Sequence, residues 1–337
     1  MTDQPWLTTD RRQLTTDQRP LTTDRRRVVA VDVGGTGIKA ALLDREAAVR
    51  HQVRRATGRE RGPEAVVATI VDLVADVQRE AEGQGAEVDA VGLAVPGIVD
   101  EATGTGEYSA TIGWRDVPFR DLVVERTGLP VVVTHDVRAG GVAEARLGAG
   151  RGEERFLFVP VGTSIAAAVM TGGRALPGAH HRAGEIGHLV VRPGGEPCAC
   201  GARGCAETYA SAAAVARRFT EATGRPAPAP EVARLAAEGD RAAGAVWQEA
   251  VDALADALLT AVLVLDPPLV VLGGGLAESG DLLLTPLAAA LAARARIQAP
   301  PRLAPAVLGD RAGCLGAGLR ALDAAAGRAA PDGSPAP

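Results

Sequence analysis

Two neighbouring stretches of this chain are its most informative sequence. They are Ala183–His188, which reads AGEIGH, and Cys198–Glu207, which reads CACGARGCAE. Together they place three of the four cysteines close together, a short distance after a histidine. Disulfides need cysteines in pairs, whereas three thiolates and one imidazole complete a tetrahedral zinc shell; ordinary free cysteines are the alternative. The sequence predicts a structural Zn²⁺ site formed by His188, Cys198, Cys200 and Cys205.

A second glycine-rich motif lies near the N-terminal end. Residues 28–39 read VVAVDVGGTGIK, an apolar run followed by a glycine turn. The run predicts a buried strand, and the glycines allow backbone N–H groups to surround a phosphate chain. Of the 36 Lys and Arg residues only Lys39 is a lysine, and the chain contains no asparagine. A lysine retained only here favours phosphate binding, because an ammonium is a more compact charge than a guanidinium.

These motifs resemble those of the ROK family of sugar kinases and sugar-responsive repressors, within the actin-like, hexokinase-type ATPase superfamily. The resemblance runs from about Val28 to Leu322 and includes His135-Asp136 and the glycines of Leu272–Leu276. It implies an α/β, two-lobed actin-like ATPase (ribonuclease H-like) fold with a cleft between the lobes. The cysteine block and its distance from His188 match the zinc-containing kinases of the family.

Length and composition agree with this resemblance. A chain of 337 residues is long enough for two lobes with separate cores, and 47% hydrophobic but 3% aromatic residues predict cores of Ala, Val and Leu. A net charge of −5 gives no electrostatic reason to expect nucleic-acid binding. No apolar span of membrane length and no signal-peptide pattern is apparent, and thiols in a zinc site imply a reducing compartment. We expect a cytoplasmic protein.

The sequence also suggests how the chain is divided. Three Leu-Thr-Thr-Asp repeats before Val28 have too few apolar positions for a coiled coil and predict disorder. Helices are expected over 116–126 and over 208–220. The expected parts are a repeat tail 1–27, an N-terminal lobe 28–135 with a C-terminal helix 313–328, a larger lobe 136–312 with a zinc loop 188–205, and a loose tail 329–337.

Asp136 is the candidate catalytic residue. It follows an apolar strand and precedes a helix. From the residues alone, capping of that helix explains an aspartate here equally well. The resemblance implies that Asp136 accepts the proton of the sugar 6-hydroxyl. It also implies that the sugar is bound by Thr111, His135, Asp136, Glu185, His188 and Glu207.

The nucleotide is assigned to three glycine-rich turns. Two of them follow similar hairpin patterns, so we expect them to face each other across the phosphates, and the third lets adenosine approach a strand end. By resemblance, Asp32 orients Mg²⁺ through water. The candidate nucleotide-binding residues are Asp32, Gly34, Gly35, Thr36, Lys39, Gly162, Thr163, Gly273, Gly274 and Gly275.

Three positions depart from the family pattern. Ser164 stands where the second phosphate loop usually has glycine, and a serine would resist a turn that needs a positive φ. His135 and Thr111 stand where the family has asparagine. Both can still hydrogen-bond a hydroxyl group. Sugar affinity, sugar choice and turnover are the properties that these departures put in doubt.

The sequence predicts an ATP- and Mg²⁺-dependent hexose kinase of the glucokinase type, which phosphorylates the 6-hydroxyl of glucose. N-acetylmannosamine, N-acetylglucosamine, fructose and allose are alternative substrates, and polyphosphate is an alternative donor. A sugar-binding transcriptional regulator, or an inactive sugar-binding module, is the alternative of another class; the segment before Val28 is too short for the helix-turn-helix domain of such a repressor. By resemblance we expect a homodimer or homotetramer.

Overall fold

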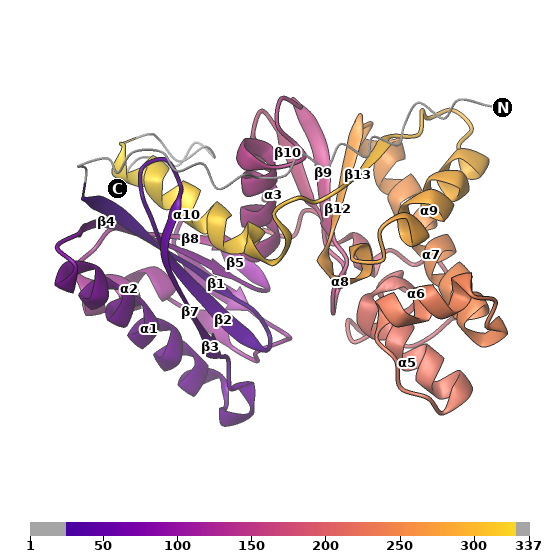
Figure 1. Ribbon diagram of the computed structural model, residues 1–337, viewed down its shortest axis with the longest axis horizontal. Coiled ribbons are helices and arrows are strands. Elements are labelled where there is room, and N and C mark those ends of the chain that lie inside the picture. The colour runs from indigo at the N-terminus through magenta and orange to yellow at the C-terminus, as the bar shows by residue number, and fades with distance from the viewer. Residues whose placement is uncertain (1–24, 328–337) are drawn as a thin grey trace. The chain divides into compact units, whose positions relative to one another are not determined.

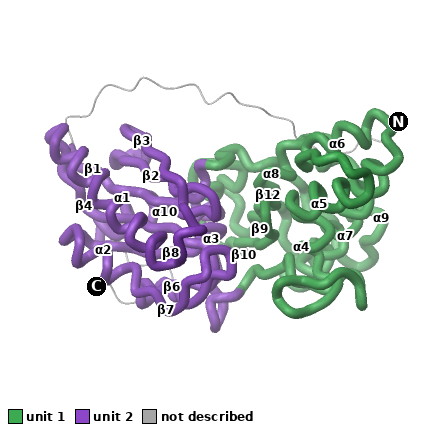
Figure 2. The backbone as a smooth tube through the Cα atoms, turned by 90° about the horizontal axis from the view of Figure 1, so that it is seen from below, with its two compact units in different colours: residues 1–8, 144–173, 183–310 green, residues 9–143, 174–182, 311–337 purple. Residues whose placement is uncertain are grey.

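The computed structural model describes residues 25–327, in which helices and strands alternate (Figure 1). These residues form two compact units, each assembled from distant parts of the sequence (Figure 2). Unit 1 comprises residues 144–173 and 183–310, and unit 2 comprises residues 25–143, 174–182 and 311–327. The expected disorder of the repeats before residue 25 and of the tail 329–337 lies outside the described residues.

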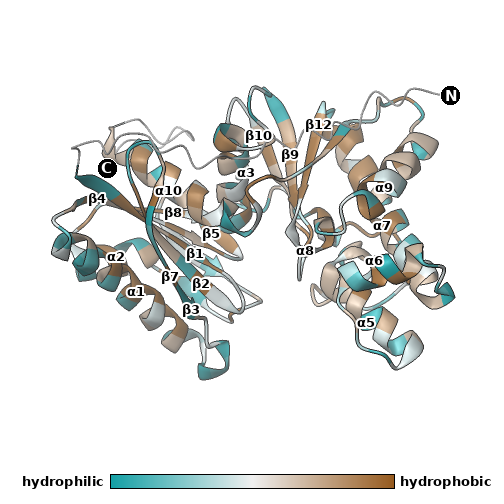
Figure 3. Ribbon diagram, in the orientation of Figure 1, coloured by the Kyte–Doolittle hydropathy of each residue, from teal (hydrophilic) through white to brown (hydrophobic). Residues whose placement is uncertain are grey.

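Unit 2 is built on a five-stranded sheet of order β3-β2-β1-β4-β8. β1 is antiparallel to β2, β2 to β3, and β1, β4 and β8 are parallel. β1 is apolar over most of its length because both of its faces are covered, whereas the edge strand β3 alternates and is hydrophilic (Figure 3). The strands are β1 (Arg26–Val33), β2 (Gly37–Leu43), β3 (Val49–Ala56), β4 (Glu87–Val95) and β8 (Val131–His135).

Helices cover both faces of this sheet. α1 (Pro63–Gly83) has buried residues at helical spacing, among them Ile70, Leu73 and Val77, which join one core with β1, β2 and β4. α2 (Phe119–Thr127) adds Phe119 to the same core. α10 (Ala312–Ala325) lies along β1 and β4 on the opposite face (Figure 1). The sheet is therefore an interior layer of unit 2.

Glycines allow α10 to approach its neighbours at backbone distance. A Cβ atom on Gly92 of β4 would overlap the carbonyl of Ala317 in α10. A Cβ atom on Gly316 of α10 would overlap the carbonyl of Ala139 in α3 (Asp136–Leu147). Because both obstacles are backbone atoms, a larger residue at either position requires the helix to move.

A smaller sheet includes the start of a segment that was expected to be helical. It has the order β5-β6-β7, and its strands are β5 (Ile98–Asp100), β6 (Thr105–Tyr108) and β7 (Arg115–Val117). We expected a helix over 116–126, but Val117 pairs with Gly106 in this sheet and α2 begins only at Phe119. Pro118 disfavours helical conformation in the residue before it, which explains the later start.

Unit 1 contains most of a second five-stranded sheet of order β11-β10-β9-β12-β13. β12 is parallel to both β9 and β13. The long helix α7 (Arg241–Leu265) supplies much of the core, because more than one of its sides is apolar. The strands are β9 (Arg155–Pro160), β10 (Ala168–Thr171), β11 (Arg174–Ala175), β12 (Leu269–Gly273) and β13 (Arg302–Pro305).

The other helices of unit 1 correct a second expectation. The segment 208–220, expected as one helix, is divided at Ser211, whose backbone is extended and whose Oγ accepts a 3.0 Å hydrogen bond from the N–H of Ala214. Ser211 thus caps a new helix inside an alanine-rich run that has no other break. The helices are α4 (Glu207–Ala210), α5 (Ala212–Thr223), α6 (Ala229–Ala237), α8 (Gly274–Ala277) and α9 (Asp281–Arg294).

The close approach of α10 gives a stability prediction. Gly316→Ala should lower Tm by about 5 °C, because overpacking a core costs about 1–3 kcal/mol. Gly244→Ala, in α7, is the matched control: a Cβ atom there meets nothing within 4 Å. It should raise Tm slightly, because alanine favours a helix by about 1 kcal/mol over glycine. Scanning calorimetry measures both, and equal Tm values for the two variants would contradict the packing argument.

Candidate functional site

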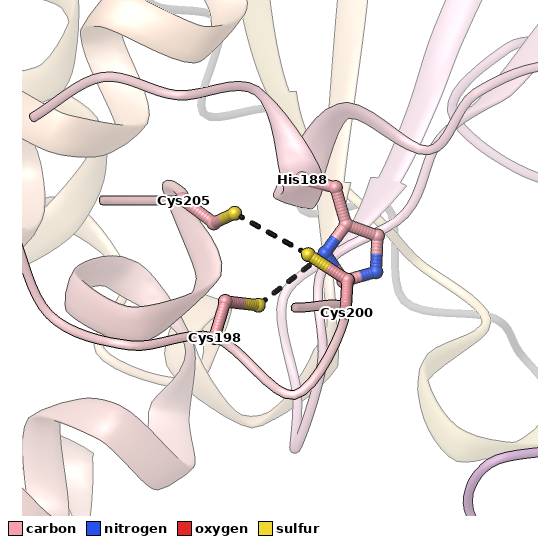
Figure 4. Close-up of side chains that lie close together, drawn as sticks. All are labelled: His188, Cys198, Cys200 and Cys205. Atoms are coloured by element: carbon pink, nitrogen blue, oxygen red, sulfur yellow. Dashed lines mark hydrogen bonds between the residues drawn. The ribbon is translucent and has the colours of Figure 1, made fainter. Parts of the chain in front are cut away.

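Unit 1 brings together the four predicted metal ligands (Figure 4). The ligand atoms of His188, Cys198, Cys200 and Cys205 all lie within 4.8 Å of one another. The Sγ of Cys198 is 3.6 Å from Nδ1 of His188, and the Sγ atoms of Cys200 and Cys205 are 3.7 Å apart. Tetrahedral zinc with sulfur at about 2.3 Å and nitrogen at about 2.0–2.1 Å separates S–N pairs by about 3.6 Å and S–S pairs by about 3.8 Å. The donor set and its spacing fit zinc.

Local backbone geometry explains how a short loop forms this cluster. The backbone carbonyl of Cys198 accepts a hydrogen bond from the N–H of Gly201, and the N–H of Cys198 donates one to the carbonyl of Ala202. These bonds close a tight turn between the cysteines. Gly204 has a positive φ, and a Cβ atom there would overlap the carbonyl of Arg192. Cys205 then forms a β-bridge with Val190. The glycines of the motif are required by this folding of the loop.

The thiols are electrostatically suited to a cation. Burial raises the pKa of Cys205 to about 12, and the neighbouring thiols contribute to the rise because adjacent thiolates repel one another. Cys205 is therefore a neutral thiol at neutral pH unless a cation replaces the proton. Metal binding at such a site releases protons and couples the metal to the folded loop.

The predicted sugar residues of unit 1 lie around this cluster. The Nδ1 of His188 faces the thiols, while its Nε2 is 3.9 Å from Oε2 of Glu185. Glu207 begins α4, and its Oε2 accepts a 2.9 Å hydrogen bond from the N–H of Ile165, next to the second glycine turn. Glu185 and His188 therefore lie beside the four candidate ligands, and Glu207 is held by the backbone at Ile165.

The second and third glycine turns lie side by side at the ends of β9 and β12. The N–H of Val161 donates a hydrogen bond to the carbonyl of Gly273, and the carbonyl of Val161 accepts one from the N–H of Leu276. Gly274 has a positive φ, and a Cβ atom there would lie 2.5 Å from the carbonyl oxygen of Val161. The predicted residues Gly162, Thr163, Gly273, Gly274 and Gly275 are thus brought together in one unit.

Ser164 causes no backbone strain in the second turn. The described non-glycine residues with positive φ are Ala47, Asp116, His181 and Asp266, and Ser164 is not among them. Its carbonyl oxygen accepts a 3.1 Å hydrogen bond from the N–H of Gly162. The conformational objection to serine at this position is therefore removed.

The first glycine turn lies in unit 2, between β1 and β2. Asp32 and Lys39 are opposite each other in the β1–β2 register, with Lys39 Nζ 3.7 Å from Asp32 Oδ2. The turn closes with a 2.9 Å bond from Gly34 N to Gly37 O. A Cβ atom on Gly35 would come within 2.9 Å of Cγ2 of Thr111, so the exposed Thr111 lies beside this turn.

Thr57 supports the first turn, a role that the sequence analysis did not predict. Its Oγ1 donates a 2.6 Å hydrogen bond to the carbonyl of Gly34, and its N–H donates to the carbonyl of Thr36. Thr57 is fully buried and directly follows β3, well beyond the glycine motif in the sequence. The pairing of β2 with β3 brings it here, and no local pattern in the sequence reports that pairing.

His135 and Asp136 stand at the junction of β8 and α3. The carboxylate of Asp136 accepts a 2.8 Å hydrogen bond from the N–H of Val137, lies 3.1 Å from Nε2 of His135, and is 31% exposed. It is therefore anchored at the start of the helix and still reachable from solvent. His135 is buried, and burial together with the Arg138 guanidinium lowers its pKa to about 3 although Asp136 is adjacent.

Comparison with known proteins places this geometry in a family. Residues 28–324 match the ROK family. The chain belongs to the ROK family. It is 33% identical over 276 residues to a glucokinase of Thermotoga maritima, covering 77% of this chain and 86% of that protein.

Solved structures of ROK proteins agree. A ROK hexokinase from Thermus thermophilus is 37% identical, with a TM-score of 0.76 over 88% of this chain and 97% of that one. A ROK glucokinase from Streptomyces griseus, solved with glucose and AMPPNP, is 30% identical, with a TM-score of 0.74 over 88% and 99%. These relationships confirm the predicted α/β actin-like ATPase fold. Within residues 25–327, no helix is long and apolar enough to cross a membrane.

The pKa of His135 gives a pH prediction. Between about pH 3 and 6.5 the unfolded chain binds a proton at His135 that the folded chain does not. The contribution of the neutral His135 to the free energy of unfolding is therefore fully present above pH 6.5. It decreases as pH falls, by on the order of 2 kcal/mol at pH 5. His135→Gln should flatten the plot of Tm against pH over this window, whereas His180→Gln, in an exposed loop, should not. Identical pH dependence in the wild type and His135→Gln would refute the assignment.

Proposed function

We propose that this protein is a glucokinase, which transfers the γ-phosphoryl group of ATP to the 6-hydroxyl of glucose. It is an ATP-dependent hexose kinase of the ROK family. The observation that carries the proposal is the likeness to two glucokinases over 77% and 88% of this chain, the second a ROK glucokinase solved with glucose and AMPPNP. The candidate residues of both units supply the chemical groups that this reaction needs.

Asp136 is the proposed general base. As the sugar oxygen attacks the γ-phosphorus, its proton passes to the Asp136 carboxylate, the bond to the bridging oxygen breaks, and ADP leaves. The partial exposure of this carboxylate at the start of α3 supports the role, because a base must be reachable by the hydroxyl. The neutral His135 beside it supplies hydrogen-bonding groups without adding a charge.

The sugar and the nucleotide are assigned to the remaining candidates. Thr111 and His135 in unit 2, and Glu185, His188 and Glu207 in unit 1, are the proposed hydroxyl-binding groups. The phosphates are assigned to Lys39 and to the three glycine turns, whose backbone N–H groups suit a polyanion. Mg²⁺ accompanies ATP and neutralises phosphate charge when bound, with Asp32 as the proposed residue that orients it through water.

Zinc is proposed as a structural ion. The spacing of the Cys₃His set supports it, and the ion would hold the loop that carries His188 beside Glu185. An imidazole whose Nδ1 binds the metal leaves Nε2 for a sugar hydroxyl. Reduced thiols favour a reducing compartment such as the cytoplasm. Family resemblance supports a homodimer or homotetramer. It also supports an N-terminal lobe of residues 28–135 with the C-terminal helix 313–328, and a larger lobe of residues 136–312.

The assignment of the base is tested by Asp136→Asn. Loss of general-base catalysis should lower kcat by about 10²–10⁴-fold, while glucose still binds. Asp281→Asn is the matched control, because Asp281 is also the first residue of a helix and its loss removes the same helix-dipole interaction. A coupled assay for ADP measures turnover on glucose. Wild-type kcat in Asp136→Asn would leave only the helix-capping interpretation of this residue.

The zinc site is tested by Cys200→Ser. Cys200 is exposed, so the substitution should lose the metal without disturbing the packing of the loop. Elemental analysis should find about one zinc per chain in the wild type and in Cys314→Ala, whose cysteine lies in α10, and far less in Cys200→Ser. We expect KM for glucose to rise more than KM for ATP, since the loop carries the proposed sugar contacts. Full zinc content in Cys200→Ser would contradict the site.

A further inference from the structure

A buried ion pair lies behind the β8–α3 junction in unit 2. Glu101 follows β5, and Arg138 is in the first turn of α3. Their side chains are 13% and 4% exposed, and Arg138 Nε donates a 2.6 Å hydrogen bond to Glu101 Oε1. Removing two charges from water is costly and is balanced only when further hydrogen bonds are made, so the surrounding contacts matter.

One carboxylate oxygen holds the chain on both sides of Asp136. Besides Arg138, Glu101 Oε1 accepts a 2.8 Å hydrogen bond from Thr134 Oγ1 and a 3.2 Å hydrogen bond from the His135 N–H. These donors precede Asp136 in the chain, and Arg138 follows it. The turn that carries Asp136 is therefore pinned to Glu101 at three points.

Arg138 extends the same network in two other directions. Its Nη2 donates a 3.0 Å hydrogen bond to the carbonyl of Val99 in β5, and its Nη1 donates a 3.2 Å hydrogen bond to the carbonyl of His181. His181 has a positive φ and belongs to the segment 174–182, which returns to unit 2. The fork of one guanidinium thus joins the start of α3, β5 and this segment, a geometry that a lysine cannot reproduce.

We propose that Glu101 and Arg138 are positioning residues for phosphoryl transfer. They do not touch the reacting atoms; they fix the turn at residues 134–138 so that the Asp136 carboxylate keeps one orientation toward the sugar hydroxyl. The inference rests on the proposed function, in which Asp136 is the base. Its physical reason is that a general base displaced by about 1 Å loses on the order of 100-fold in rate.

The charge balance around Glu101 supports an orienting role. Arg320 of α10 lies near the other carboxylate oxygen, with Nη2 3.6 Å from Glu101 Oε2. Glu101 is thus held between two buried guanidinium groups from different helices. A carboxylate constrained in this way has little freedom to rotate, and its Oε1 becomes a fixed acceptor for the turn.

Three variants test the proposal by steady-state kinetics. Arg138→Lys keeps the charge but loses the fork, and should lower kcat about 10- to 100-fold with less than about threefold change in KM for glucose and ATP. Glu101→Gln keeps one acceptor oxygen and should lose less activity than Glu101→Ala. Arg302→Lys is the control for loss of a guanidinium group, because Arg302 also donates a 2.6 Å hydrogen bond to a glutamate, Glu153, in a more exposed pair in unit 1. It should keep wild-type kcat even where Tm falls.

The outcomes separate this proposal from the function on which it rests. If Asp136→Asn retains turnover, the base is wrongly assigned. Suppose instead that Asp136→Asn is inactive while Arg138→Lys and both Glu101 variants keep wild-type kcat at assay temperatures well below their Tm. The positioning role alone is then overturned. Should those variants not fold, Thr134→Val removes one hydrogen bond from the same turn. A several-fold fall in its kcat supports the proposal, and an unchanged kcat refutes it.

Discussion

The close packing of α10 on the sheet of unit 2 is the constraint on which most of that unit depends. The helix and β1 come from opposite ends of the described chain, and the helix can approach the sheet because Gly92 in β4 lacks a side chain, while Gly316 lets it approach α3. Near its N-terminal end, a Cβ atom on Gly313 would come 2.8 Å from the Asp32 carboxylate. The same contact therefore closes the core and restricts where Asp32 and its partner Lys39 can lie.

The local motifs were predictable because each performs its chemistry with neighbouring residues. The four candidate ligands lie between positions 188 and 205, so their pattern can be recognised without knowledge of the rest of the fold, and the structure brings their donor atoms together. The alternation of strands and helices likewise follows from apolar periodicity. Errors occurred where one residue overrides a pattern: Pro118 delays α2, and Ser211 divides an alanine-rich helix.

The sequence does not reveal the residues that hold the first glycine turn and the β8–α3 junction in place. Thr57, Glu101 and Arg138 are an ordinary threonine, glutamate and arginine in the sequence, since their partners lie on other strands and helices. Such contacts depend on strand register and on the path of the chain between elements, which no short pattern reports. Burial changes the energetic cost of losing such a contact: a solvated Glu–Arg pair contributes little to stability, whereas removal of one partner of a buried pair leaves an uncompensated charge.

His135 stands where the family pattern has asparagine, in a chain that contains no asparagine. An amide side chain is neutral at every ordinary pH, whereas a free imidazole is partly protonated near pH 6.5. Burial and the Arg138 guanidinium lower the pKa of His135 to about 3, so the ring remains neutral throughout the physiological range. A histidine in this environment can replace an amide as a neutral hydrogen-bonding group. Arg138 thus has two effects on the junction: it binds Glu101, which accepts hydrogen bonds from the turn before Asp136, and it helps to keep the adjacent ring uncharged.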